Sequence, residues 1–384
     1  MTDPYALLAI GGGAAGFAAA RAFREAGGRG PVAIVSDERR MPYRRPPLTK
    51  DLLRGELPEA RLPLEPEAWL AEHGVSLVSG RALSLSLTLD ASASAAAGAA
   101  AGVGAGGGEL TLAGGRTLRW RSCVLATGAE PKRLPLPGCD DPAVRVVRTL
   151  DDVRELLARL QDAPDVVVIG SGFIGCEIAA SLRHRGHAVT LISDEPAPNH
   201  ARLGERAAAE LAGWLRSEGV RLRLGAGVDA IERRESMLCV AAGEARVEAP
   251  LVVMAAGVAP RSELAAGVGA ELIDGAIPVD AAMRTRLPGV LAAGDVCLAH
   301  NEAAGRPLRV EHWGDALAQG AVAGATAAGR PASWDEVPGF WSTIGERTLK
   351  YAAWGDGYEE VRFDGAGDGA PFTVWYGREG RIVG

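Results

Sequence analysis

The sequence predicts an α/β protein with two doubly wound domains of parallel sheet and a small α+β domain at its C-terminal end. The glycine pattern G-x-G-x-x-G occurs twice, at residues 11–16 and 170–175. Each copy follows an apolar run and opens a segment with helical composition, which is the order strand, glycine turn, helix. Beyond residue 334, tryptophans and Gly-Asp turns separate short β-like runs, so an antiparallel domain is expected there.

The two repeats predict the same series of elements. Gly27-Gly28 ends the first helix and Gly186 ends the second, because glycine readily adopts the conformation that closes a helix. The predicted elements are, in order, strand 6–10, helix 14–25, strand 32–35, strand 166–169, a helix from the glycine turn to about residue 185, and strand 188–192.

Residues 91–108 consist almost entirely of Ala, Gly and Ser. They lie between two β-like runs, 82–89 and 109–112, and we expect a tolerated loop insertion. A short helix is the alternative, although the glycines work against it. In the C-terminal stretch, strands are predicted at residues 350–354, 360–363 and 372–376.

Composition excludes several classes of function. The 384 residues are enough for two or three domains, and 47% hydrophobic with 23% charged residues is typical of a globular protein. A net charge of −7 argues against nucleic acid as a partner. The longest strongly apolar run, 251–259, is too short to span a bilayer. The five cysteines form no C-x-x-C pair, so no metal site is expected, and free cysteines suit a reducing cytoplasm. No basic leader segment is expected before the first strand.

Each glycine turn predicts a site for the pyrophosphate of a dinucleotide. The first glycine makes the tight turn, the second lets the backbone approach the pyrophosphate, and the third lets helix and strand pack closely. Free N–H groups at the helix N-terminus favour the negative charge. Two such Rossmann-like units predict two dinucleotides in one chain, and thus electron transfer between them. The alternative is one cofactor site and one unit without a ligand.

Acidic residues follow the second strand of each repeat, where a carboxylate accepts hydrogen bonds from ribose hydroxyls. Asp37 is the candidate in the first repeat, with Glu38 as second choice, and Asp194 or Glu195 is the candidate in the second. A carboxylate repels a 2′-phosphate, and no arginine stands in its place. We therefore expect NADH in preference to NADPH.

Residues 42–50, Pro-Tyr-Arg-Arg-Pro-Pro-Leu-Thr-Lys, resemble the PY-x-RPPLSK segment of the FAD-dependent ferredoxin and rubredoxin reductases and of the apoptosis-inducing-factor relatives, within the pyridine nucleotide-disulfide oxidoreductase superfamily. Further blocks are similar to motifs of the same family in the same order: Leu-Ala-Thr-Gly at 125–128, Thr285–Val290 with Ala293-Gly294-Asp295, Val310–Trp313 with Gln319-Gly320, and Phe-Trp-Ser at 340–342.

The resemblance implies an FAD domain interrupted by an NAD domain and followed by an interface domain. The corresponding ranges are 1–131 and 255–325 for FAD, 132–254 for NAD, and 326–384 for the interface domain, which would be shorter than in relatives. The resemblance also implies residue roles at the flavin. Gly11, Gly13 and Gly16 would hold the FAD pyrophosphate, and Asp37 the adenosine ribose.

The same resemblance gives the remaining FAD contacts. Arg45 would neutralise phosphate charge, and Lys50 would donate a hydrogen bond beside flavin N5. Asp295 would bind the ribityl hydroxyls, with Gly294 allowing close approach. The flavin would be lined from its far side by Glu311, His312 and Trp313.

For the second dinucleotide, Gly170, Gly172 and Gly175 would hold the NADH pyrophosphate. Phe173 would meet the nicotinamide, and Glu177 would contact its carboxamide and pair with Lys50. Packing in the core is the alternative for Phe173, His312 and Trp313. The candidate catalytic residues are Lys50, Glu177 and Trp313, and the further candidates for cofactor contact are Thr127, Gly128, Ile174, Asp194, Glu195 and Gly257.

Thiol chemistry is not expected, because residues 11–50 contain no cysteine and Cys176 has no partner nearby in sequence. Electrons would then leave from the flavin edge to a one-electron carrier, a ferredoxin-type [2Fe-2S] protein. Its docking patch should be basic. The candidate docking residues are Arg39, Arg40, Arg44, Arg45, Lys50, Arg306 and Arg309.

The sequence thus predicts a cytoplasmic NADH-dependent flavoprotein reductase, monomeric or homodimeric. The alternative is an NADH-responsive redox sensor like the apoptosis-inducing factors, which the Glu311-His312 pair resembles. An NADH oxidase that reduces oxygen ranks last, because it would need a redox cysteine.

Overall fold

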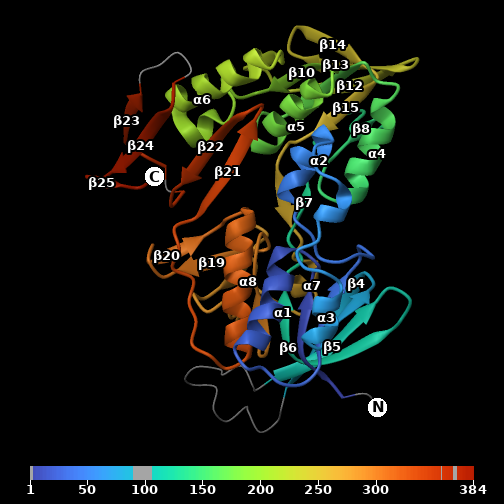
Figure 1. Ribbon diagram of the computed structural model, residues 1–384, viewed down its shortest axis with the longest axis vertical. Helices are drawn as coiled ribbons and strands as arrows, with labels where there is room; N and C mark the ends of the chain where they lie inside the picture. Colours follow the sequence, from blue (N-terminus) through green and yellow to red (C-terminus); the bar gives the residue numbers. More distant parts are fainter. Residues whose placement is uncertain (1–2, 90–105, 356, 366–369) are drawn as a thin grey trace. The chain divides into compact units, whose positions relative to one another are not determined.

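The computed structural model describes residues 3–89, 106–355, 357–365 and 370–384 (Figure 1). The chain forms two compact units. The first comprises Met1–Arg44, Pro63–Ala129 and Ala259–Phe340, and the second comprises Arg45–Leu62, Glu130–Val258 and Trp341–Gly384. The boundaries given above for FAD, NAD and interface domains stay a prediction.

The first unit contains a parallel sheet with strand order β3-β2-β1-β6, in which β18 pairs with β6. Beyond β6 the sheet continues antiparallel through β5 to β4. These strands are β1 (Tyr5–Ile10), β2 (Val32–Ser36), β3 (Val75–Ser79), β4 (Ala82–Leu89), β5 (Gly106–Leu112), β6 (Thr117–Leu125) and β18 (Val290–Ala292). The predicted strand–helix–strand repeat and its parallel pairing are confirmed.

Helices α1 (Ala14–Glu25) and α8 (Trp313–Ala327) of this unit lie against each other at backbone distance. A Cβ atom at Gly320 would collide with the backbone of Ala15, and one at Gly324 with that of Ala19. The two glycines therefore permit the contact. The smaller elements of the unit are α3 (Ala68–Glu72), α7 (Glu263–Ala266), β17 (Ile277–Val279), β19 (Cys297–Asn301) and β20 (Arg306–Leu308).

The second unit contains a parallel sheet with strand order β11-β10-β9-β15-β8 and an antiparallel sheet of β12, β13 and β14. The parallel strands are β8 (Val144–Arg145), β9 (Asp165–Ile169), β10 (Ala188–Ser193), β11 (Arg221–Leu224) and β15 (Leu251–Met254). The antiparallel strands are β12 (Ala230–Arg234), β13 (Met237–Ala242) and β14 (Ala245–Ala249). The helices are α2 (Asp51–Arg54), α4 (Leu150–Leu160), α5 (Phe173–His184) and α6 (His200–Ser217), with 3-10 turns η1 (Pro46–Thr49) and η2 (Glu59–Arg61).

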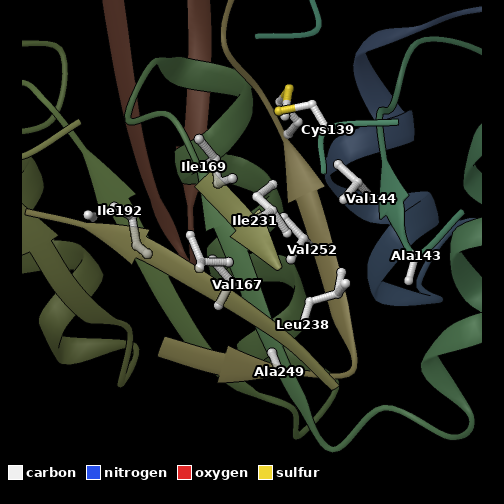
Figure 2. Packing of buried hydrophobic residues seen from close by; sticks show 13 residues of the cluster. Cys139, Ala143, Val144, Val167, Ile169, Ile192, Ile231, Leu238, Ala249 and Val252 are labelled. Atoms are coloured by element: carbon white, nitrogen blue, oxygen red, sulfur yellow. The ribbon is translucent and has the colours of Figure 1, made fainter. Parts of the chain in front are cut away.

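One apolar core joins the two sheets of this unit. Val167 of β9 and Val252 of β15 point toward Ile231 of β12 and Leu238 of β13 (Figure 2). Each of these side chains is at most 3% exposed. The burial of branched side chains in this core explains why β15 and residues 166–169 of β9 are continuously apolar in sequence.

The C-terminal residues form β21 (Gly339–Ile344), which pairs with β22 (Arg347–Ala352), and a separate antiparallel sheet of β23 (Glu360–Gly365), β24 (Phe372–Arg378) and β25 (Arg381–Ile382). The strands expected at 360–363 and 372–376 are confirmed with longer bounds, and β21 was not foreseen. The bounds expected for the strand at 350–354 are wrong, because β22 begins at Arg347 and ends at Ala352. Strands β7 (Ala129–Pro131) and β16 (Val258–Pro260) complete the described elements. No helix in the described ranges is both long and apolar enough to cross a membrane.

The expected loop at residues 91–108 is wrong at its end, because residues 106–108 begin strand β5. A Cβ at Gly106 would overlap the carbonyl of Pro288, and one at Gly108 would overlap Ser86 and the ring of Trp120. Glycine is thus required there by close packing, although it is a poor strand former in general. Residues 91–105 lie outside the described part of the chain.

Candidate functional site

The first glycine turn has the shape that a pyrophosphate needs. Gly11 has a φ of +129°, and a Cβ there would overlap the carbonyl of Ala126. A Cβ at Gly16 would overlap the carbonyl of Gly11, so strand and helix are in backbone contact. At Gly13, the N-cap of α1, no atom of the described residues beyond the adjacent backbone lies within 4 Å of where a Cβ would be. The middle glycine therefore faces open space at a helix N-terminus, and these residues fit the pyrophosphate of FAD.

The second turn repeats this arrangement at the start of α5. Gly170 has a φ of +102° and packs on the carbonyl of Ala255, and Gly175 packs on the carbonyl of Gly170. Gly172 is the N-cap and again has open space where a side chain would be. Ile174 beside it is 39% exposed. This turn fits a second dinucleotide in the same way.

The acidic residues after β2 and β10 differ in how firmly they are held. Asp37 and Asp194 are exposed. Glu38 accepts a hydrogen bond of 2.6 Å from the hydroxyl of Tyr43, and its N–H donates to Ser36 Oγ at 3.2 Å. The geometry favours Glu38, the second choice from sequence, over Asp37 as the oriented carboxylate.

Glu195 is held in a closely similar way. Its N–H donates to Ser193 Oγ at 3.2 Å, and its Oε2 accepts from the N–H of Ala201 at 3.3 Å. The two repeats therefore share a serine that fixes the backbone of the glutamate two residues later. The sequence did not predict that Tyr43 and the two serines contact these glutamates. The contacts form only because the chain turns back after each strand.

A buried polar cluster joins Lys50 and Glu177, as expected. Lys50 Nζ lies 3.0 Å from Glu177 Oε2, and the two side chains are 9% and 6% exposed. Thr49 Oγ1 donates to the same oxygen at 2.5 Å. Ser342 Oγ donates to Glu177 Oε1 at 2.8 Å, and Ser342 is fully buried. Both carboxylate oxygens are thus satisfied, and the ammonium is fixed in direction.

This cluster brings together three distant parts of the chain. Lys50 lies between η1 and α2, Glu177 in the second turn of α5, and Ser342 in β21. Ser181 Oγ of α5 also donates to the carbonyl of Thr49 at 2.8 Å. Burying an ionised carboxylate costs little free energy only when hydrogen-bond donors surround it. The sequence paired Lys50 with Glu177 by resemblance, but it gave no indication that Thr49 and Ser342 complete the cluster.

In the first unit, several predicted residues lie at the C-terminal ends of β6 and β18. Gly294 has a φ of +84°, and its N–H donates to Gln319 Oε1 of α8 at 2.9 Å. Asp295, 9% exposed, follows it. Thr127 Oγ1 donates to the carbonyl of Arg261 at 2.5 Å, and Gly128 has a φ of +69°. The carboxyl ends of parallel strands are where α/β folds bind ligands.

Residues 311–313 lead into α8. His312 is its N-cap; a ring nitrogen lies 3.1 Å from Asp315 Oδ2, and the ring centroid lies 4.6 Å from that of Phe340. Trp313 is the first residue of the helix. Glu311 is exposed and pairs with Arg309 at 3.0 Å.

The remaining predicted residues include Lys50, Arg45 and Gly257, whose burial and backbone contacts are as follows. Lys50 is buried, so its assignment to an exposed docking patch is wrong. Arg45 donates from Nη1 to the carbonyl of Arg148 at 2.6 Å. Gly257 has a φ of +91° with open space at its Cβ position, and its carbonyl accepts from the N–H of Lys132.

All five cysteines of the chain are free and buried. Burial raises the pKa of the Cys123 and Cys176 thiols far above the usual range, and the nearby Glu177 adds to the effect at Cys176. The thiolate is the reactive form, so neither cysteine is suited to exchange electrons with a disulfide.

Comparison with known proteins agrees with this geometry. The rubredoxin-NAD(+) reductase of Pseudomonas putida is 31% identical over 90% of this chain and 86% of its own length. The ferredoxin–NAD(+) reductase component of the anthranilate 1,2-dioxygenase system of Burkholderia cepacia is 33% identical over 99% of this chain and 89% of its own. Human apoptosis-inducing factor 3 is 28% identical over 98% of this chain, which spans 60% of that protein.

Solved structures give the same result. The ferredoxin reductase for the CYP199A2 system of Rhodopseudomonas palustris superimposes with a TM-score of 0.88 at 29% identity, covering 98% of this chain and 89% of that one. Putidaredoxin reductase, in its covalent complex with putidaredoxin, gives 0.86 at 27% identity, covering 98% and 88%. The predicted fold class is confirmed.

The family model for pyridine nucleotide-disulphide oxidoreductases matches residues 5–320. This match and the relatives confirm the resemblance drawn from the motifs, and with it an FAD-dependent NAD(P)H oxidoreductase of the ferredoxin reductase type. The chain belongs to the pyridine nucleotide-disulphide oxidoreductase family.

Proposed function

We propose that this protein is an NADH-dependent flavoprotein reductase that delivers electrons singly to a ferredoxin-type [2Fe-2S] protein. The observation that carries this function is the pair of glycine turns, each with an open middle glycine at a helix N-terminus. We assign FAD to the turn at Gly11–Gly16 and NADH to the turn at Gly170–Gly175.

When bound, FAD supplies a centre that accepts a hydride from the nicotinamide and gives up electrons one at a time. The residues of the chain bind and orient. Lys50 is a cation with a fixed direction, because Glu177 holds its Nζ at 3.0 Å. We propose that it faces flavin N5 and that Glu177 also orients the nicotinamide carboxamide. Fixed charges of this kind need no reorganisation during the reaction.

We propose NADH in preference to NADPH because of the carboxylates after β10. Glu195 is fixed by Ser193 and Ala201, and Asp194 is exposed beside it. A 2′-phosphate placed at this position would meet negative charge. Glu195→Gln should therefore narrow the preference, raising kcat/KM for NADPH relative to NADH.

The acceptor is proposed from both chemistry and relatives. Two relatives are named for rubredoxin and ferredoxin, and one neighbouring structure is a complex with putidaredoxin. The buried cysteines support direct transfer from the flavin rather than through a thiol. We also propose a location in the reducing cytoplasm, because the cysteines are free thiols. Whether it is a monomer or a homodimer stays a prediction.

The test is a spectral titration followed by turnover. The purified protein should carry a flavin absorption spectrum that bleaches with NADH at lower concentration than with NADPH, and should then reduce a [2Fe-2S] ferredoxin. A protein that cannot be loaded with FAD would contradict the proposal. Loaded protein that NADH does not bleach would also contradict it.

One second candidate rests on a specific match, that to apoptosis-inducing factor 3. In that case NADH reduction would be slow, and the reduced complex would persist with a charge-transfer band. Stopped-flow reduction separates the two, since fast reduction with fast ferredoxin turnover supports the reductase. Slow reduction with a change of oligomeric state supports the sensor.

A further inference from the structure

The start of helix α6 is not a normal helical turn. Its N-cap, Asn199, has left-handed backbone angles of φ 55° and ψ 28°. Five residues later Gly204 has φ 73° and ψ 174°, which interrupts the helix. Residues 199–203 therefore form a separate turn, hereafter the clamp turn, fixed at both ends by conformations that most residues avoid.

The first end of the clamp turn is bonded to the second glycine turn. Asn199 is 6% exposed, and its backbone N–H and its side-chain Nδ2 each donate to the carbonyl of Ser171 at 3.1 Å. Cys176 Sγ lies 3.3 Å from the same oxygen. Ser171 is the residue between Gly170 and Gly172. Asn199 therefore holds the peptide at the centre of the turn.

The other end of the clamp turn is bonded to the C-terminal sheet. The carbonyl of Leu203 accepts a hydrogen bond of 2.6 Å from the hydroxyl of Tyr376 in β24, and Tyr376 is 6% exposed. At Gly204 a Cβ would collide with the hydroxyl of Tyr358, whose ring lies 4.8 Å from that of Tyr376. The hydroxyl of Tyr376 thus holds the carbonyl at which the clamp turn ends, and Tyr358 packs beside it without bonding to Leu203.

The middle of the clamp turn meets two further residues assigned to NADH. The guanidinium of Arg202 lies 6.0 Å from the centre of the Phe173 ring. The N–H of Ala201 donates to Glu195 Oε2. The clamp turn therefore bonds to the glycine turn and to the residue placed at the ribose, and its arginine lies over the ring of the residue placed at the nicotinamide.

We propose that the clamp turn presets the shape of the NADH site, and that Asn199 and Tyr376 are positioning residues for NADH affinity. The proposal rests on the assignment of NADH to the turn at 170–175. Asn199 fixes the Ser171 peptide, so that Gly172 N–H and the N-terminus of α5 keep their direction. Tyr376 carries the same constraint from β24, which makes NADH affinity depend on the C-terminal sheet.

The first test uses Asn199→Gly, because glycine keeps the left-handed backbone and removes only the amide side chain. In anaerobic stopped-flow reduction of the FAD-loaded enzyme, the Kd for NADH should rise about tenfold while the limiting rate changes less than about twofold. FAD content should equal that of the wild type. Hydrogen exchange of residues 170–176 without NADH should become faster, which reports on the turn apart from any reaction.

The second test compares Tyr376→Phe with Tyr358→Phe. The first removes the hydroxyl that binds Leu203, and the second removes a neighbouring hydroxyl that lies over Gly204. Only Tyr376→Phe should raise the Kd for NADH and speed exchange at residues 170–176.

The outcomes of these tests distinguish failure of the proposed role of the clamp turn from failure of the proposed reductase function. If NADH reduces the wild type with a measurable Kd, and neither Asn199→Gly nor Tyr376→Phe changes that Kd or the exchange, the clamp is refuted and the reductase stands. If the wild type with FAD is not reduced by NADH at all, the proposed function fails and the clamp fails with it.

Discussion

The buried pair of Lys50 and Glu177 allows a quantitative prediction for the variant Lys50→Met. Methionine keeps the length of the side chain and removes the ammonium. Glu177, whose side chain is 6% exposed, would then keep only the hydroxyls of Thr49 and Ser342 as partners among the described residues. Leaving a buried charge without its counter-ion costs about 3–5 kcal/mol.

A double-mutant cycle isolates the coupling energy between Lys50 and Glu177 from the rest of this loss of stability. Lys50→Met alone should destabilise α5 by about 3–5 kcal/mol, whereas adding Glu177→Gln should restore much of the loss, because no buried charge remains. The coupling energy should be about 2–3 kcal/mol. Arg221 and Asp165 form the control pair, since they lie 3.2 Å apart with side chains 62% and 43% exposed. Their coupling should be about 0–1 kcal/mol.

The assay is native-state hydrogen exchange, read at the α5 amides for the buried pair and at the β9 and β11 amides for the control pair. It gives the free energy of local opening without assuming that both units unfold together. Measurement in excess FAD keeps the loading equal between variants. A coupling energy between Lys50 and Glu177 no larger than that of the exposed pair would show that burial does not strengthen this ion pair. The same cycle read in the rate of flavin reduction shows whether the direction of the ammonium matters for reaction.

Three further predictions follow from single sites. Gly170→Ala should abolish NADH reduction and destabilise the second unit, because its Cβ would overlap the Ala255 carbonyl, whereas Gly172→Ala should fold normally and weaken only NADH binding, as a melting curve and a titration would show. Cys176→Ser should keep ferredoxin turnover, since burial raises the thiol pKa and leaves no reactive thiolate; loss of turnover with normal FAD content would contradict this. The Arg233 side chain lowers the pKa of Asp141, so this pair stabilises the fold fully above about pH 3.8, and its contribution is lost as pH falls through the lowered value. Asp141→Asn should therefore reduce stability more at pH 7 than at pH 2, in thermal melts at both pH values.

Local signals in the sequence were sufficient for the two repeats. The helix expected at residues 14–25 has those bounds in the structure, because a glycine turn and a glycine stop mark its ends. The parallel pairing followed from the strand–helix–strand order. Features set by sequence neighbours, such as the tight turn at Gly11, can be predicted from one chain alone.

What the sequence missed depends on residues far apart along the chain. Ser342 reaches Glu177 across 165 positions, and Tyr376 reaches Leu203 across 173. Asp37 was preferred over Glu38 on spacing, but Tyr43 orients the glutamate after the chain turns back. Serine and tyrosine residues occur in many structural contexts, so only the folded structure shows the contacts that Ser342, Tyr376 and Tyr43 make.

In the proposed reaction, electrons pass from NADH through FAD to the acceptor without a thiol. The number of NADH equivalents taken up per flavin in an anaerobic titration tests this route. We expect complete bleaching with one equivalent of NADH and no further uptake, since FAD accepts one hydride. Uptake of a second equivalent, with the appearance of two alkylatable thiols, would contradict it.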